Sequence, residues 1–198
     1  MELLEGERVL AFDLETTGIS TKNDRIVQLA LIGSDSNGSE ISYDQLVNPR
    51  RPIPYESQRI HGISDSDVRG EPDFATIADR VSELIEGSVL IGHNVRQFDL
   101  PMLRTEFLRI GALPPEPKAI LDTLELARRL KLPRPHRLGT LCSRHGISLE
   151  NAHTASADAA ASLLLLWKLG RDHPSYFRKS LQEVEQWCIT GTSAKSQS

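Results

Sequence analysis

Two acidic residues near the start of the chain have the type and spacing expected of metal ligands. Asp13 and Glu15 are two positions apart in an apolar run, and on a strand both carboxylates would leave the same face. Two acids side by side repel each other, and buried charges must be paired or coordinate a metal. An exposed polar face of a half-buried strand would also explain the pair. A strand buried on both sides is favoured by the apolar neighbours Val9, Leu10, Phe12 and Leu14.

A third acid, Asp99, opens a predicted helix shortly after the apolar stretch Val89–Ile91. Acids at this place are ordinarily stabilised by the helix dipole, so Asp99 alone would indicate little. The carboxyl end of a central strand, however, is where α/β sheets commonly hold ligands. Asp99 is therefore a candidate for the same site.

His153 and Asp158 lie on either side of Thr154, which is a good N-cap for the alanine-rich segment that follows. This predicts His153 on a loop and Asp158 in the first turns of a helix. A spacing of five suits a mobile base beside a fixed acid better than two ligands on one helical face. Taken alone, His153 would be a surface loop residue, and only its association with the four acids favours a catalytic role.

The elements that must position these residues follow from hydrophobic spacing. Strands are predicted over residues 8–15, 25–32, 40–47 and 88–92, and helices over residues 74–85, 98–110, 122–130, 137–145 and 154–169. Three strands in sequence, followed by alternating helices and strands, indicate an α/β layered domain with a mixed central sheet.

The bulk properties are those of one globular domain. The 198 residues are 39% hydrophobic and 25% charged. We expect a single domain over residues 1–190, with its core at about 8–170, and a flexible tail over 191–198. Two cysteines, no basic-then-apolar leader and no apolar stretch long enough to span a bilayer predict a reduced, cytoplasmic protein without a membrane segment.

The formal net charge of −4 argues against a broad basic face that grips long nucleic acid. It does not exclude a nucleic acid substrate, because bound cations invert the field of an acidic site.

The candidate residues lie in segments that resemble the three motifs of the DEDDh exonucleases, namely residues 12–18, residues 93–99 and residues 153–158. Within that family the chain most resembles the epsilon-type proofreading exonuclease domains of bacterial replicative DNA polymerases, through residues 46–49, 60–65 and 122–124. The resemblance covers about residues 9–169. It implies a ribonuclease-H-like α/β fold with helices around a five-stranded mixed sheet.

The resemblance also implies a mechanism. Asp13, Glu15, Asp99 and Asp158 would hold two divalent cations, Mg²⁺ or Mn²⁺, and hard carboxylate oxygens suit both ions. His153 would be the general base. The expected activity is 3′-5′ exonuclease hydrolysis that releases nucleoside 5′-monophosphates from the 3′ ends of single-stranded DNA or RNA, with DNA favoured.

The resemblance further implies a substrate pocket, whose lining would be Leu14, Thr17, Gly18, Ile19, His61, Asn94 and Phe98. A hydrogen bond that caps its own loop is an equal alternative for His61. Basic residues also cluster between Arg128 and Arg144. Guidance of a phosphate backbone would explain them, but a solvated charged face is the more usual meaning of such a run.

Two roles stay open for the chain. One is a catalytically competent nuclease, and the other is a proofreading or docking subunit that acts mainly by binding a polymerase or a repair protein. The intact acids and histidine favour catalysis. No sliding-clamp motif of the Gln-x-x-Leu-Phe type occurs between Tyr176 and Cys188, which favours a stand-alone enzyme.

Overall fold

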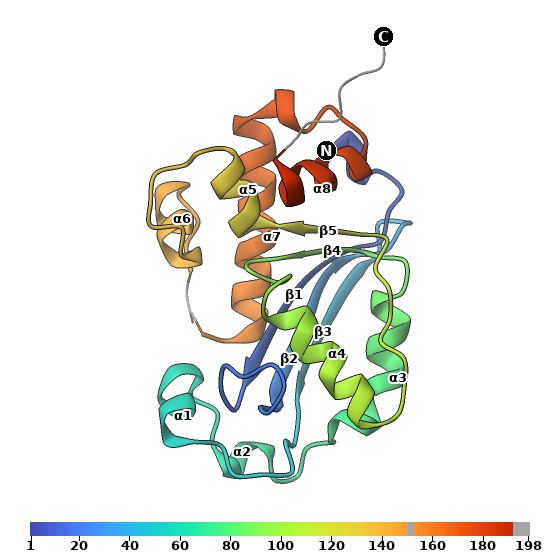
Figure 1. Ribbon diagram of the computed structural model, residues 1–198, viewed down its shortest axis with the longest axis vertical. Coiled ribbons are helices and arrows are strands. Elements are labelled where there is room, and N and C mark those ends of the chain that lie inside the picture. The colour runs from blue at the N-terminus through green and yellow to red at the C-terminus, as the bar shows by residue number, and fades with distance from the viewer. Residues whose placement is uncertain (150–152, 192–198) are drawn as a thin grey trace.

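A five-stranded mixed sheet organises the computed structural model, which describes residues 1–149 and 153–191 (Figure 1). The strands lie in the order β3-β2-β1-β4-β5. The first three pair antiparallel, whereas β1, β4 and β5 pair parallel. Their bounds are β1 Val9–Thr16, β2 Ile26–Ser34, β3 Glu40–Leu46, β4 Val89–Gly92 and β5 Ala119–Asp122. The predicted meander and mixed sheet are confirmed.

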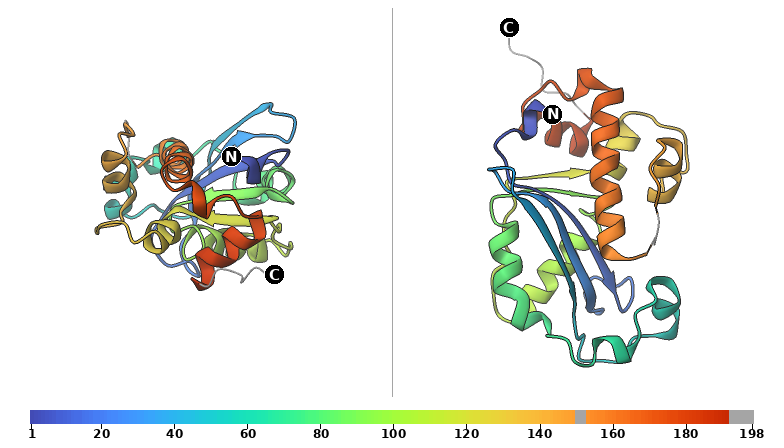
Figure 2. Two further views of the ribbon diagram at one scale, coloured as in Figure 1. Left: turned by 90° about the horizontal axis from the view of Figure 1, so that it is seen from above. Right: turned by 180° about the vertical axis from the view of Figure 1, so that it is seen from behind.

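Helices cover both faces of the sheet (Figure 2). The α-helices are α1 Tyr55–His61, α2 Asp65–Val68, α3 Phe74–Ile85, α4 Asp99–Arg109, α5 Thr123–Arg129, α6 Leu138–Arg144, α7 Ala155–Asp172 and α8 Leu181–Thr190, and two 3₁₀ turns are η1 Glu2–Leu4 and η2 Pro174–Tyr176. Helices α3 and α4 pack with Phe12 and Leu90 on one face, and α5, α7 and α8 pack with Ala11 and Ile91 on the other.

The two apolar layers explain why β1 lies at the centre. Leu10, Ala11 and Phe12 have no exposed surface, so the strand is apolar on both faces. Such a strand is stable only when helices cover both sides of the sheet. The exception is its carboxyl end, where Asp13 and Glu15 are only partly buried. The polar residues therefore lie at the edge of the core.

Helix α4 is fixed to the turn after β1 by a buried carboxylate. Glu106 is 1% exposed and accepts hydrogen bonds from Arg25 at 2.7 and 3.1 Å and from Arg109 at 2.9 Å. A buried carboxylate with several charged donors holds its partners in one geometry. The contact fixes α4 relative to the segment between β1 and β2.

Several elements were not predicted from spacing. Residues 119–122 form a strand, and the helix predicted from Asp122 begins at Thr123 with Asp122 as its N-cap. The strand has only four residues, which is too short for a pattern of period two. Helix α8 was also missed, although Ser180 and Glu183 form a capping box that marks its start.

Two further features concern the cysteines and membranes. Both cysteines, Cys142 and Cys188, are buried and unpaired, and free cysteine commonly packs as a small hydrophobic residue. Over the residues described, no helix combines the length and the hydropathy needed to cross a bilayer. The predicted tail lies, apart from Gly191, outside the described residues.

Candidate active site

The carboxyl half of β1 carries the first two acids. Ala11 belongs to the apolar layer under α7, and Asp13 and Glu15 follow it at intervals of two. The alternation of a strand therefore directs both carboxylates to the face that α7 covers. The predicted common face of the pair is present in the fold.

Asp99 reaches the same place from α4. The parallel pairing of β1 with β4 extends from Val9 and Val89 to Ala11 and Ile91. Three residues beyond Ala11, the N–H of Leu14 donates a hydrogen bond to the Asp99 carboxylate at 3.1 Å. This bond attaches the first residue of α4 to the backbone between Asp13 and Glu15.

Gly92 makes the close approach of the two strands possible. A Cβ atom at this position would lie 2.9 Å from the carbonyl oxygen of Phe12 and 2.7 Å from the side chain of Val95. Such contacts are shorter than packed carbon atoms tolerate. A larger residue at Gly92 would push β4 away from the strand that carries Asp13.

The fourth acid, Asp158, lies in the first turn of α7. The hydroxyl of Thr154 caps the helix by accepting from the N–H of Ala157 at 3.4 Å. The side-chain oxygen of Gln28, on β2, accepts from the N–H of Ala155 at 3.2 Å. Gln28 therefore positions the start of α7 against the sheet.

The geometry brings three of the four acids within reach of one ion. One carboxylate oxygen from each of Asp13, Glu15 and Asp158 lies within 4.8 Å of the other two. Asp99 belongs to the same cluster, because its charge raises the pKa of both Asp13 and Glu15. All four acids predicted from the sequence converge.

The raised pKa values of the four acids show that their ionised forms are unfavourable at this place in the fold. Burial, followed by the charges of neighbouring acids, raises the pKa of Glu15 to about 8. Burial also raises the pKa of Asp99 to about 8, against the hydrogen bonds that it accepts, and raises the pKa of Asp13 and of Asp158. Ionised carboxylates packed this closely need a positive partner.

A divalent cation fits the cluster. Asp158 Oδ1 is buried and has no hydrogen-bond partner among the described residues, which is costly for a carboxylate oxygen unless a ligand satisfies it. The cluster offers hard oxygen donors of the kind that Mg²⁺ and Mn²⁺ prefer. The residues present are therefore suited to the metal that the sequence predicts.

His153 lies at the start of α7, as predicted, with a left-handed backbone at φ 69°. It is exposed. Its backbone hydrogen-bonds to the Asp158 carboxylate, and its ring lies near enough that a positive charge on it lowers the pKa of Asp158. The histidine is thus beside the acid cluster and open to solvent. Its role as general base stays a prediction.

The turn after β1 holds three of the predicted pocket residues. Thr17 is buried and donates its hydroxyl to Asp24 at 3.0 Å. Gly18 packs so closely on Asp24 that a Cβ atom would lie 2.6 Å from that carboxylate. Ile19, by contrast, has a side chain that is 91% exposed. The turn is rigid at its base and presents one apolar side chain to solvent.

The other predicted pocket residues have different surroundings. His61 is 7% exposed, and its Nδ1 accepts from the N–H of Ile63 at 3.0 Å. This is the capping contact that was the alternative to substrate binding. Asn94 and Phe98 are half-buried, with Asn94 at φ 68°. Leu14 is buried and contributes its N–H to Asp99. Their contacts with a substrate stay predictions.

Asp122 is a positioning residue that the sequence did not reveal. It is 1% exposed, and its Oδ1 accepts from the N–H groups of Asn94 and Leu124, both at 2.9 Å. Its Oδ2 accepts from the N–H of Arg96 at 3.3 Å. One carboxylate thus caps α5 and also fixes the loop that leads to Asp99. The Asp-Thr pair before a helix was the available signal, since aspartate is a common N-cap.

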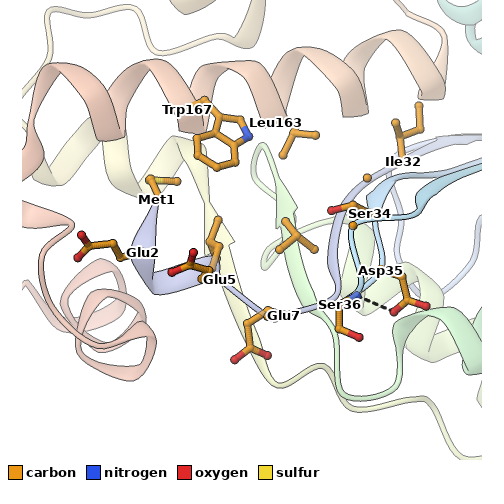
Figure 3. A pocket seen from close by; sticks show the side chains of 15 residues that line it. Met1, Glu2, Glu5, Glu7, Ile32, Ser34, Asp35, Ser36, Leu163 and Trp167 are labelled. Atoms are coloured by element: carbon orange, nitrogen blue, oxygen red, sulfur yellow. Dashed lines mark hydrogen bonds between the residues drawn. The ribbon is translucent and has the colours of Figure 1, made fainter.

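A separate pocket of about 630 Å³ lies elsewhere, between η1, the β2–β3 hairpin and α7 (Figure 3). Ile32, Leu163 and Trp167 line its apolar side, and Glu2, Glu5 and Glu7 stand along η1 and the segment after it. The pocket has none of the predicted catalytic residues in its lining. It is separate from the acid cluster.

Solved structures share this architecture. The zinc-bound complex of E. coli exonuclease I with single-stranded DNA matches with a TM-score of 0.75 and 25% identity, covering 85% of this chain and 41% of that chain. Exonuclease X in complex with 5′ overhanging duplex DNA matches with a TM-score of 0.68 and covers 91% of this chain and 99% of that chain. At 22% identity, the second match supports the fold alone.

Curated relatives include bacterial DNA polymerases. The PolC-type DNA polymerase III of Halalkalibacterium halodurans is 35% identical over 172 residues, and that of Bacillus subtilis is 34% identical over 173 residues. Each match covers 86% of this chain and 12% of the polymerase. The chain thus spans about an eighth of the length of these relatives.

The family model RNase_T, described as Exonuclease, matches residues 10–166. This range contains all four acids and His153. It also contains the four strands from β2 to β5 and nearly all of β1, which together form the ribonuclease-H-like sheet. The chain therefore belongs to the RNase T family of DEDD exonucleases, which are phosphodiester hydrolases.

Proposed function

We propose that this protein is a metal-dependent 3′-5′ exonuclease that removes nucleoside 5′-monophosphates from the 3′ ends of single-stranded DNA. The observation that carries the proposal is the convergence of Asp13, Glu15 and Asp158 within 4.8 Å, with Asp99 attached to the backbone between the first two. Membership of an exonuclease family supports the same reaction class.

Asp13, Glu15, Asp99 and Asp158 would hold the divalent ions, Mg²⁺ or Mn²⁺. When bound, such ions lower the pKa of a water nucleophile and stabilise the charge that develops on the leaving oxygen. The solved exonuclease I complex contains zinc, which supports a cation site in this fold.

The residues of the chain supply positioning and proton transfer. The four carboxylates are held by β1, α4 and α7 before any substrate arrives, so little reorganisation is needed during the reaction. The exposed His153 would accept the proton of the attacking water, because an imidazole nitrogen beside the acids can act as a general base. The exposed Ile19 would pack against the terminal base, and the buried turn beneath it would hold that base in place.

Single-stranded DNA is the proposed substrate because exonuclease I was solved with single-stranded DNA and the curated relatives are DNA polymerases. A polymerase or another repair protein is the proposed partner, and the cytoplasm is the proposed location.

The test is digestion of a 5′-labelled single-stranded oligonucleotide. We expect a ladder that shortens from the 3′ end, release of 5′-monophosphates, and loss of activity in EDTA that Mg²⁺ or Mn²⁺ restores. A matched RNA oligonucleotide measures the preference for DNA, which rests on contacts with the 2′-hydroxyl. An Asp13→Asn variant that retains wild-type activity would contradict the proposal.

A further inference from the structure

A concave pocket of about 610 Å³ lies at the carboxyl end of β4, between α5 and the loop that leads to α6. It contains three arginines and two histidines, and none of its lining residues is acidic. We call it the basic pocket, and its lining is His93, Asn94, Leu124, Arg128, Arg134, Pro135, His136, Arg137 and Leu138.

The loop that forms one wall of this pocket is held in shape by hydrogen bonds. Arg144 donates to the carbonyl oxygens of Pro133 at 2.5 Å and Arg134 at 3.0 Å. His136 Nε2 lies 2.7 Å from the carbonyl oxygen of Leu132, and the carbonyl oxygen of His136 lies 2.9 Å from His93 Nε2. The wall therefore needs little ordering before a ligand binds, which lowers the cost of binding.

The three arginines of the basic pocket keep their positive charge available. Arg128, Arg134 and Arg137 are exposed, and none of them forms an ion pair with an acid in the part of the chain that the structure describes. Their neighbour Arg129, by contrast, donates to the carbonyl oxygens of Cys188 and Ile189. Guanidinium groups that form no ion pair and surround a hollow are suited to phosphate oxygens, which they bind in a bidentate fashion.

The basic pocket adjoins the acid cluster. Ala11 on β1 is paired with Ile91 on β4, and a Cβ atom on Gly92 would lie 2.9 Å from the carbonyl oxygen of Phe12. Asp13 follows Phe12 and His93 follows Gly92, so the first acid of the cluster and a histidine of the basic pocket come directly after two backbone segments that are in contact. A strand whose 3′ end lies at the acids can therefore continue into the basic pocket.

We propose that the basic pocket binds phosphate groups of the substrate strand on the 5′ side of the scissile bond. Arg128, Arg134 and Arg137 are the phosphate ligands, and the loop fixed by Arg144 holds two of them beside the acids. The proposal rests on the proposed exonuclease function. It assigns a positioning role to part of the basic run, for which a solvated face was the favoured interpretation of the sequence.

The test is the variant Arg128→Ala/Arg134→Ala/Arg137→Ala, with Arg69→Ala/Arg80→Ala/Arg178→Ala as the matched control. The control removes the same positive charge from exposed arginines outside the basic pocket. The substrates are a single-stranded DNA of about a dozen nucleotides and a DNA dinucleotide. A dinucleotide is too short to occupy both sites.

In the pocket variant, we expect the ratio of kcat/KM for the longer substrate over the dinucleotide to fall by about tenfold. The dependence of log KM on log salt for the longer substrate should become shallower by about 2, because each phosphate contact to a single strand contributes roughly 0.7 to the slope. Equal changes in the control variant, or an unchanged salt slope, would overturn the proposal.

A direct binding measurement separates this proposal from the exonuclease function. Fluorescence anisotropy of the labelled longer DNA is recorded in EDTA, where no hydrolysis occurs. Weaker binding by the pocket variant than by the control supports the basic pocket even if the wild-type protein degrades neither substrate, which would refute only the exonuclease function. Equal binding by the two variants would refute the basic pocket even if the wild-type protein is an active nuclease.

Discussion

His153 combines two properties that a general base requires, since it lies beside the acid cluster and is open to solvent. We expect His153→Ala to lower kcat by ~10²–10⁴-fold, the usual contribution of a general base, while circular dichroism and the thermal midpoint stay near those of the wild type. His173→Ala, at the far end of α7, is the matched control and should leave kcat unchanged. Equal kcat values for the wild type and His153→Ala would exclude the role.

The four acids make the metal-free protein sensitive to pH. The pKa of Glu15 and of Asp99 is raised to about 8, and the pKa of Asp13 and of Asp158 is also raised. In the unfolded chain these groups ionise near pH 4. Between pH 5 and pH 8 the folded state therefore holds protons that the unfolded state has released. The free energy of unfolding must fall as the pH rises through this window.

Thermal melts in EDTA measure this effect. We expect the midpoint to fall between pH 5 and pH 8, and Asp158→Asn to be more stable than the wild type at pH 8 by about 3 °C or more, which corresponds to roughly 1 kcal/mol in a chain of this size. Mg²⁺ should raise the wild-type midpoint more at pH 8 than at pH 5, because it binds the ionised carboxylates. If the thermal midpoints of the wild type and of Asp158→Asn were both independent of pH, repulsion between the carboxylates would not destabilise the folded protein.

At the scale of elements, the site depends on caps that join separate segments. Asp122 accepts hydrogen bonds from the loop before α4 and from the start of α5. Asp122→Ala would leave three partly buried N–H groups without this partner, so we expect the free energy of unfolding to fall by about 3 kcal/mol. Because the loop leads to Asp99, Mg²⁺ should also bind more weakly. Urea denaturation and metal titration are the measurements.

Asp73 provides the control for this prediction. It caps α3 by accepting from Thr76, and it also accepts from the exposed Arg50, but it has no contact with the loop that leads to Asp99 in the hydrogen bonds of the described residues. Asp73→Ala should therefore cost about 1 kcal/mol, the usual loss for an N-cap, without a change in Mg²⁺ affinity. If the two substitutions had equal effects on stability and metal binding, Asp122 would be an ordinary cap.

At the scale of the whole molecule, α8 completes the core although it lies beyond the residues that match the exonuclease family. Trp187 is 8% exposed and stacks on Tyr176 at 4.8 Å, and Glu185 accepts from Arg96 at 2.6 Å and from the N–H of Ile120 on β5. We expect Trp187→Ala to lower the free energy of unfolding by about 3–5 kcal/mol.

The chain's second tryptophan is the matched control. Trp167 is 42% exposed, so Trp167→Ala should cost less than about 1 kcal/mol. Both values come from urea denaturation followed by circular dichroism. If Trp187→Ala lowered the free energy of unfolding as little as Trp167→Ala, α8 would not be part of the folding unit. The predicted domain of residues 1–190 would then end earlier.

The sequence by itself predicted the parts of this protein that depend on local pattern. The apolar run of β1, with acids at intervals of two, predicted both the strand and the common face of Asp13 and Glu15. The N-cap at Thr154 predicted the start of α7 and the place of Asp158. The motifs were sufficient to indicate the family, because their residues and their order can be read from the sequence without knowledge of the fold.

Only the tertiary structure decided how distant segments meet. The hydrogen bond between Leu14 and Asp99 joins residues 85 positions apart, and the double role of Asp122, as cap of α5 and as anchor of the loop before α4, depends on two segments that are separate in sequence. The sequence did not show that the basic residues between Arg128 and Arg144 form a pocket. The fold places Arg128, Arg134 and Arg137 with His93 in the lining of one pocket. Local periodicity carries no information on such contacts, because the free energy that selects them comes from burial and charge shared between elements that are distant in sequence.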